Sequence, residues 1–343
     1  MENSKVMIVG AGNQGLAMAA YLEINNVECY LYNRTAGHIR KIMETNEIVC
    51  SGVLNKRVYV SHVSSKIEDA LQKTIVVATP ASAHKEVAAL LAKHVDSSYT
   101  ILLSPGKTFG IIDFIYNLRL AGCNEIPIIA ECQTTIFASR REGENSVKIY
   151  ALKNDIPIAS TREESLDKVL NKMPECLRMR YKKVNSYIET SFGNIGMILH
   201  PIPMLLNFGS IESNRVFKYY TEGITPTIAS LIERLDSERL EIAHELGYEL
   251  ESIVDWMMRN YDTNGKGLYE HLQTNKYYQE IVSPVLVCNR YIEEDVPYGL
   301  VPMEDTALKL GIKVPVTTEV ISFANIIMNC DYRKYGRLCM LDM

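Results

Sequence analysis

The first third of the chain alternates short apolar runs with segments of helical periodicity. Helices are predicted at about 15–25 and around 39–44, where apolar residues recur at helical spacing. Strands are predicted at KVMIVG (5–10), VECYLYN (27–33), RVYVSHV (57–63), TIVVATP (74–80) and TILLSP (100–105), which are short runs rich in Val, Ile and Leu. Strands separated by helices are typical of a parallel sheet that is covered on both faces.

The pattern changes after Lys153. The segment 162–173 and most of 190–330 place apolar residues three and four positions apart, as amphipathic helices do, and the longest example is TPTIASLIERLDSERLEIAHELG (225–247). We therefore expect an α/β domain of the Rossmann type over residues 1–180 and an all-α domain over residues 181–343.

Composition agrees with two globular domains that act on small molecules. The 343 residues, 47% of them hydrophobic, exceed the usual size of one domain. The formal net charge is −5 and both signs are mixed along the chain, so no basic stripe favours nucleic acid or an anionic membrane. The eight cysteines show no metal-ligand spacing and lie mostly in apolar stretches.

The N-terminal segment MENSKVMIVG contains an acidic residue and no signal-type apolar region, and no run approaches 18 apolar residues. We expect a cytoplasmic protein with small-molecule ligands, no metal, no membrane or nucleic-acid partner, and a homodimer as a candidate assembly.

A glycine motif follows the first predicted strand. Gly10, Gly12 and Gly15 stand in G-x-G-x-x-G order, with Asn13 and Gln14 between the second and third glycines. Such a loop makes a tight turn, lets backbone approach a pyrophosphate and allows close packing of helix on strand. These five residues are predicted to bind a dinucleotide cofactor.

The end of the second predicted strand bears on which cofactor binds. An NAD-preferring site usually has an acidic residue here, whereas this chain has Asn33, Arg34 and Thr35. An arginine pairs well with a ribose 2′-phosphate, so NADP is expected to be preferred, with NAD as the other possibility. Pro80, at the end of the fourth predicted strand, is a further candidate for cofactor binding.

An ionisable ring, His200, stands between two apolar runs in GNIGMILHPIPMLLNFGS (193–210). One interpretation is a core histidine satisfied by a backbone group. The other is a proton donor at the mouth of a helix that begins at Pro201, since proline is tolerated in a first helical turn.

Charged residues also cluster in NRYIEEDVPYGLVP (289–302), directly before a turn rich in proline and glycine. Such charges are usually solvated. Arg290 precedes Asp295 by five residues, however, which is close enough for both side chains to face one cleft on a rigid loop.

Seven motifs along nearly the whole chain resemble one family, and they occur in that family's order: GAGNQGLAMAAYL, TPASAH, SPGKTFG, AECQTTIFASR, ETSFGNIGMILHP, SLIERLDSERLEIAHELG and RYIEEDVPYGLVP. The chain resembles the opine dehydrogenases of the octopine/nopaline dehydrogenase type. The resemblance implies a dinucleotide-binding domain followed by a helical domain. It also implies reductive condensation of the amino group of an amino acid with a 2-oxo acid, with NADH or NADPH as the reductant.

The resemblance places His200 at the family's catalytic histidine, Asp295 at its carboxylate partner and Arg290 at an arginine near the substrate; Thr134 falls near a substrate-binding threonine. The residue types suit the chemistry. Histidine titrates near neutral pH, a carboxylate on its other ring nitrogen fixes the tautomer, and arginine can hold a substrate carboxylate with two hydrogen bonds.

Two alternatives share parts of this pattern. A ketopantoate reductase or glycerol-3-phosphate dehydrogenase type of 2-oxo acid or hydroxy-acid reductase has the same architecture, but it would use a lysine in the helical half. A non-enzymatic NADP-binding sensor needs the glycine loop and has no use for a proton donor such as His200.

Overall fold

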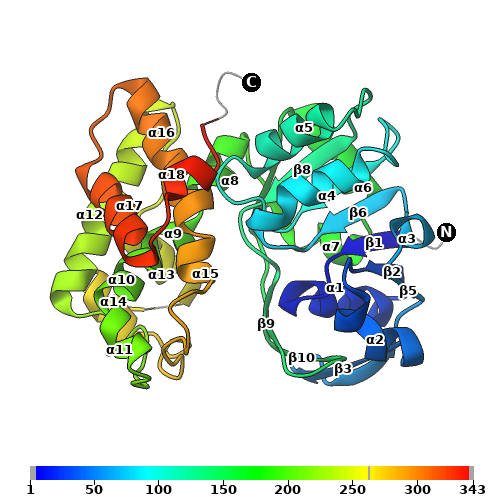
Figure 1. The fold of residues 1–343 in the computed structure, drawn as a ribbon, viewed down its shortest axis with the longest axis horizontal. Helices are drawn as coiled ribbons and strands as arrows, with labels where there is room; N and C mark the ends of the chain where they lie inside the picture. Colours follow the sequence, from blue (N-terminus) through cyan, green and yellow to red (C-terminus); the bar gives the residue numbers. More distant parts are fainter. Residues whose placement is uncertain (1–4, 262, 340–343) are drawn as a thin grey trace. The chain divides into compact units, whose positions relative to one another are not determined.

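The computed structural model describes residues 5–261 and 263–339, and the chain divides into two compact units between Ser191 and Phe192 (Figure 1). We call these unit 1 and unit 2. The division lies after the boundary expected at residue 180, because residues 181–183 form a strand that pairs within the sheet of unit 1.

Unit 1 is built on an eight-stranded sheet with strand order β12-β11-β8-β7-β6-β1-β2-β5. All neighbouring strands are parallel except β8 and β11, which run antiparallel. The strands are β1 (Lys5–Val9), β2 (Glu28–Tyr32), β5 (His62–Ser64), β6 (Thr74–Val77), β7 (Thr100–Leu103), β8 (Ile128–Cys132), β11 (Ile156–Ser160) and β12 (Tyr181–Lys183).

The central strands are buried on both faces because successive side chains point to opposite sides of a sheet. In β1, Val6 and Ile8 belong to one hydrophobic cluster, while Met7 and Val9 belong to the other. Helices cover both faces: α1 (Asn13–Ile24), α2 (Ala36–Thr45), α3 (Ile67–Ala70), α4 (His84–Leu91), α5 (Gly110–Leu120), α6 (Glu163–Lys172) and α7 (Glu175–Arg178), with a 3₁₀ turn, η1 (Ala81–Ala83), before α4. Helix α8 (Tyr187–Phe192) ends one residue after the division between the two units.

A second, four-stranded sheet in unit 1 has the order β4-β3-β10-β9 and packs against α1 (Figure 1). Its strands are β3 (Glu47–Gly52), β4 (Lys56–Tyr59), β9 (Phe137–Arg141) and β10 (Ser146–Leu152). The prediction of one strand over 57–63 is wrong. The strand is interrupted near Val60, because β4 pairs with β3 in the small sheet while β5 pairs with β2 in the large one.

Unit 2 is helical. Its elements are α9 (Ile195–Leu199), α10 (Pro201–Leu206), α11 (Phe208–Glu212), α12 (Pro226–Glu245), α13 (Ile253–Tyr261), α14 (Leu268–Thr274), α15 (Arg290–Glu293), the π-helical turn η2 (Val296–Leu300), α16 (Val301–Leu310), α17 (Pro315–Met328) and α18 (Tyr332–Tyr335). The long helix predicted over 225–247 is α12, which Thr225 caps by accepting a hydrogen bond from the backbone of Ile228.

The predicted fold class, a Rossmann-type α/β domain followed by an all-α domain, is confirmed.

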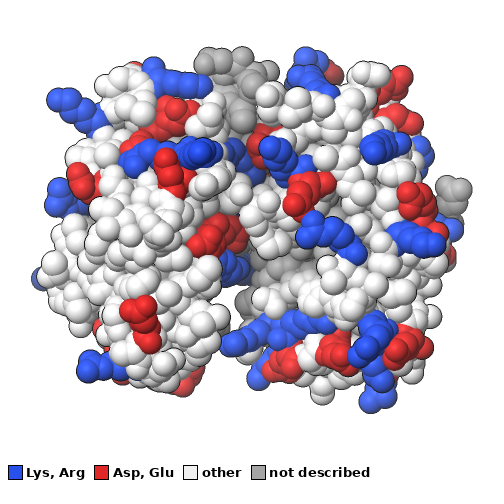
Figure 2. All heavy atoms as spheres, in the orientation of Figure 1, with Lys and Arg blue, Asp and Glu red and all other residues white. Residues whose placement is uncertain are grey.

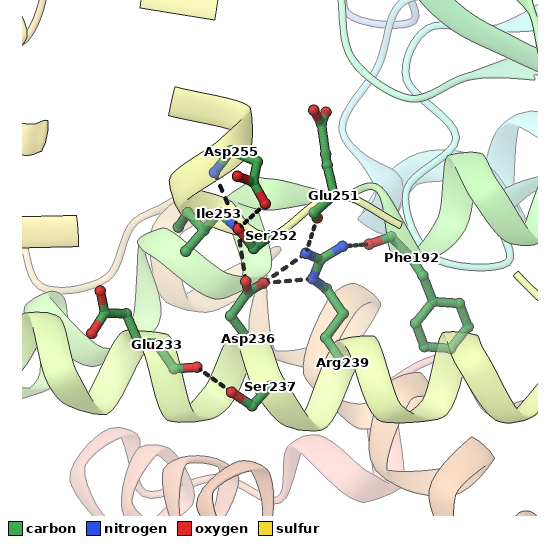
Figure 3. A network of polar contacts seen from close by, with 9 residues as sticks. All are labelled: Phe192, Glu233, Asp236, Ser237, Arg239, Glu251, Ser252, Ile253 and Asp255. Atoms are coloured by element: carbon green, nitrogen blue, oxygen red, sulfur yellow. Dashed lines mark hydrogen bonds and ion pairs between the residues drawn. The ribbon is translucent and has the colours of Figure 1, made fainter. Parts of the chain in front are cut away.

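A buried ion pair organises the centre of unit 2 (Figure 3). Arg239 and Asp236, one turn apart on α12, are 0% and 2% exposed. Arg239 also donates hydrogen bonds of 2.8 Å to the carbonyls of Phe192 and Glu251, and Asp236 accepts a 2.7 Å bond from the backbone N–H of Ile253. The pair thus joins α12 to the first residue of unit 2 and to the start of α13.

The face of the molecule in Figure 2 carries basic and acidic side chains interspersed with one another. Among residues 5–261 and 263–339, no helix has both the length and the apolar character that crossing a membrane requires.

Replacement of Arg239 by methionine should strongly destabilise unit 2, because Asp236 and two carbonyls would lose a buried cationic partner. Breaking a buried pair costs about 3–5 kcal/mol. Urea unfolding followed by circular dichroism would measure the loss. Arg234→Met on the exposed side of the same helix is the matched control, and equal unfolding midpoints for the two variants would contradict the assignment.

Candidate functional site

The glycine loop between β1 and α1 has the geometry of a phosphate cradle. Gly10 has a φ of +104°, and its N–H donates to the carbonyl of Tyr32 at 2.8 Å. A Cβ on Gly15 would lie 1.8 Å from the carbonyl oxygen of Gly10, so the helix can start here only with glycine. A Cβ on Gly12 would meet nothing within 4 Å, which leaves space beside the backbone.

This loop fits a dinucleotide pyrophosphate, because the N-terminus of the twelve-residue helix α1 presents backbone N–H groups next to the space at Gly12. The side chains of Asn13 and Gln14 also have partners within unit 1. Asn13 Oδ1 accepts a hydrogen bond from the backbone N–H of Arg141, and Gln14 donates one to the carbonyl of Phe137. Both side chains therefore attach the loop to β9.

The predicted residues after β2 also have defined partners. Asn33 Oδ1 accepts a 3.1 Å bond from the backbone N–H of Ala11, and its amide donates to the carbonyl of Thr35, the N-cap residue of α2. Arg34 forms an ion pair with Glu86 of α4. Asn33 thus supports the glycine loop, while Arg34 lies on the surface beside it.

Other predicted residues of unit 1 lie at the same edge of the sheet. Pro80 follows β6 and precedes η1, and Thr134 lies in the bend after β8. Since β1, β2, β6 and β8 all end at the carboxyl edge of a parallel arrangement, Gly10, Asn33, Pro80 and Thr134 lie at the edge where such folds bind ligands.

Unit 2 brings His200 and Asp295 together. His200 Nδ1 lies 2.7 Å from Asp295 Oδ2, and the Asp295 side chain is 2% exposed whereas that of His200 is 14% exposed. His200 is the N-cap residue of α10, which begins at Pro201 as expected. The phenol of Tyr219 donates a 2.9 Å bond to the carbonyl of His200; burial raises the pKa of this phenol well above its ordinary value and keeps it protonated.

Sequence reasoning missed two residues that lie beside the histidine ring. Tyr291 stacks on His200 with ring centroids 4.0 Å apart and an interplanar angle of 19°. A Cβ on Gly196 would lie 3.2 Å from Asp295 Oδ1 and 3.4 Å from His200 Cε1, so glycine leaves room for the pair. In the sequence, only the position of Tyr291 next to Arg290 indicated that it could lie at the site.

Arg290 is the first residue of α15 and is exposed. Its guanidinium carbon lies 5.7 Å from the ring centroid of Tyr291, on the segment that also carries Asp295. Unit 2 therefore holds a histidine–carboxylate pair, an aromatic ring on the histidine and an accessible cation in one neighbourhood. Over the described part of the chain, no group of three or more His, Cys, Asp or Glu residues is arranged to bind a metal ion.

Comparison with known families divides the chain in the same way. Residues 183–328 match the family model "NAD/NADP octopine/nopaline dehydrogenase, alpha-helical domain", and residues 6–104 match that of ketopantoate reductase. The opine dehydrogenase of Arthrobacter sp. (strain 1C) is 30% identical over 342 residues, which cover 98% of this chain and 94% of that protein.

The chain belongs to the opine dehydrogenase family.

Further relatives agree. The vitopine synthase of Allorhizobium ampelinum is 27% identical over 97% of this chain and 94% of its own. An octopine dehydrogenase structure with NADH and L-arginine has a TM-score of 0.77 at 18% identity and covers 98% of this chain and 96% of its own. A yersinopine dehydrogenase structure with NADP⁺ has a TM-score of 0.73 at 14% identity over 99% and 94%. These structures share the fold of this chain.

The protein is therefore an NAD(P)-dependent oxidoreductase acting on CH–NH bonds, and its reaction is the reductive condensation of an amine with a 2-oxo acid. The resemblance seen in the sequence is confirmed. The sensor alternative is wrong, and the hydroxy-acid reductase alternative fails because the helical half matches the octopine/nopaline model. The homodimer and the cytoplasmic location stay predictions.

Gly12→Ala should leave folding unchanged and weaken dinucleotide binding at least about tenfold, because the added methyl group enters the space beside the phosphate cradle. Fluorescence titration with NADPH and NADH, together with the thermal midpoint, would separate the two effects. Gly209→Ala, in helix α11 of unit 2 and likewise open around its Cβ, is the control. Unchanged affinity in Gly12→Ala would contradict the cradle.

Proposed function

We propose that this enzyme is an NADP(H)-dependent opine dehydrogenase in which His200 and Asp295 transfer and stabilise the proton and Arg290 holds the 2-oxo acid. The observation that supports these roles most directly is the 2.7 Å contact of His200 Nδ1 with the buried carboxylate of Asp295. Burying a carboxylate costs free energy, and a histidine with a purely structural role in the core would not require such a partner.

The condensation needs an acid at one defined step. The amine attacks the carbonyl carbon of the 2-oxo acid, and the resulting carbinolamine loses its hydroxyl as water to give an imine. That hydroxyl leaves only when protonated, and the His200 imidazolium can supply the proton from Nε2 because Nδ1 is held by Asp295. Asp295 stabilises the positive charge on the ring, and Tyr291 keeps the ring plane in place.

The remaining roles follow from accessibility and charge. Arg290 is exposed and presents a forked donor that matches a carboxylate, so we assign it to the carboxylate of the 2-oxo acid. Thr134, at the carboxyl edge of the sheet in unit 1, is assigned a hydrogen bond to substrate. The nicotinamide, when bound, supplies the hydride that reduces the imine, while the Gly10–Gly15 loop holds the pyrophosphate.

Two features support a preference for NADP(H). The end of β2 carries Asn33 where a carboxylate would repel a 2′-phosphate, and Arg34 follows it. The ion pair of Arg34 with Glu86 is a surface pair, with side chains 73% and 64% exposed, and such pairs contribute little to stability. Arg34 can therefore leave Glu86 and pair with a 2′-phosphate with little loss of stability.

Substitution His200→Ala should lower kcat about 10²- to 10⁴-fold with unchanged NADPH affinity, because the ring moves a proton and does not hold the cofactor. Asp295→Asn should lower kcat by a smaller factor, since the tautomer of the His200 ring is no longer fixed. Arg290→Ala should instead raise the KM for the 2-oxo acid. Oxidation of NADPH with a panel of 2-oxo acids crossed against amino acids measures all three.

The matched control is His244→Ala, which removes a histidine from an exposed pair with Glu249 in the same unit. It should leave turnover unchanged. Near-full turnover in His200→Ala would make His200 a core residue only. Reduction that needs the 2-oxo acid and no amine would contradict the condensation.

Arg34→Ala should weaken NADPH binding about tenfold, the value of one exposed charge-assisted contact to a phosphate, and leave NADH binding within about twofold. Glu86→Gln should strengthen NADPH binding about two- to fivefold, because the competing carboxylate is gone. Fluorescence titration of both cofactors at low salt measures these ratios. A wild-type protein that binds NADH as tightly as NADPH would refute the preference.

A further inference from the structure

Arg141, the last residue of β9, has every guanidinium nitrogen engaged. Nε donates to the carbonyl of Gly143 at 2.8 Å, and Nη2 donates to the carbonyls of His38 and Glu144 at 2.7 and 2.6 Å. Nη1 donates to the carbonyl of Ala11 at 2.9 Å and lies 2.6 Å from His38 Nε2. One side chain thus connects the β9–β10 turn, the glycine loop and the first turn of α2.

The acceptors around Arg141 are neutral. Four are carbonyl oxygens, and the fifth is the imidazole of His38, whose pKa is lowered first by burial and then by Arg141 itself, so the ring is an uncharged acceptor at neutral pH. The negative charge of the nearby Glu144 carboxylate acts to raise the pKa of Arg141. That carboxylate forms its ion pair with Arg40, however, with Oε1 3.9 Å from Arg40 Nη2. The guanidinium keeps its positive charge, because arginine is not deprotonated in proteins.

The position of this charge matters for a dinucleotide. Ala11 belongs to the loop that fits the pyrophosphate, and His38 lies in the first turn of α2, directly after the Asn33–Thr35 segment where a ribose 2′-substituent is expected. Strand β9 packs beside α1 (Figure 1), and its last residue, Arg141, contacts Ala11 and His38 although they are far away in the sequence. Arg141 therefore lies between the places expected for the pyrophosphate and for the 2′-phosphate of NADP(H).

We propose that Arg141 is a specificity-determining residue for the cofactor, whose charge attracts the ribose 2′-phosphate and whose hydrogen bonds hold the glycine loop and α2 at the spacing that NADP(H) needs. This inference rests on the proposed use of NADP(H). Arg34 is exposed and tied to Glu86, whereas Arg141 is half-buried and held by five contacts. A preorganised charge loses less entropy on binding than a mobile one.

The test compares the full-length protein with three variants: Arg141→Met, Arg141→Lys and Arg140→Met. Arg140 precedes Arg141 on β9 and is exposed, and its side chain points to the opposite face of the strand, so its loss matches the change in net charge. Calorimetric titration gives the Kd of NADPH, NADH, 2′,5′-ADP and 5′-AMP at two salt concentrations, and thermal unfolding reports on folding. The readout is affinity and needs no amine or 2-oxo acid.

Arg141→Met should weaken NADPH and 2′,5′-ADP about 10- to 100-fold and lower the NADPH-to-NADH affinity ratio at least about fivefold, with a smaller salt dependence for NADPH. Arg141→Lys should restore part of the ratio because the charge remains. Arg140→Met should leave the ratio unchanged.

Equal weakening of NADPH and NADH in Arg141→Met would mean that Arg141 only supports the loop, and it would overturn the inference. An equally large fall of the ratio in Arg140→Met would also overturn it, because the effect would then be one of net charge. The NADPH-to-NADH affinity ratio of the wild type tests the proposed NADP(H) preference separately. A wild type that binds NADH more tightly refutes that preference. If the ratio still falls in Arg141→Met and not in Arg140→Met, the role of Arg141 is retained.

Discussion

The contact between Gly15 and the carbonyl of Gly10 is the constraint on which unit 1 depends. A methyl group on Gly15 would overlap that oxygen, so β1 and α1 can meet at this distance only across two glycines. The close meeting aims the N-terminus of α1 at the carboxyl edge of the sheet. Asn33 then binds Ala11, and Asn13 and Gln14 bind β9, so the surrounding polar side chains hold the loop in that position.

Unit 2 depends on buried carboxylates instead. Asp236 pairs with Arg239, and Glu238 accepts hydrogen bonds from the backbone of Val316 and Thr317 at the positive end of α17. Asp295 is as deeply buried, but its partner is the ring of His200. A buried carboxylate thus fixes helices at two places and, in the proposed mechanism, orients the proton donor at the third, and its partner decides which role it has.

Cofactor selection in the proposed enzyme is shared between two arginines of different exposure. Arg34 is exposed and pairs with Glu86 on the surface, while Arg141 is held in place by carbonyls of three segments. An exposed charge favours encounter with an anion, and a fixed one favours a single bound geometry. The small sheet therefore contributes more than packing for α1, because its strand β9 delivers the fixed charge.

The sequence by itself determined the local features: the glycine loop, the strands and helices of strong periodicity, Pro201 at the first turn of α10, and the change to helical spacing that separates the two domains. It also named His200, Arg290 and Asp295, because family motifs carry those residues. It missed the small sheet and the break near Val60, since pairing with one of two sheets is not encoded in a single run. The stacking of Tyr291 on His200 and the contacts of Arg141 with Ala11 and His38 were decided only by the tertiary structure, because they join residues that are 91, 130 and 103 positions apart.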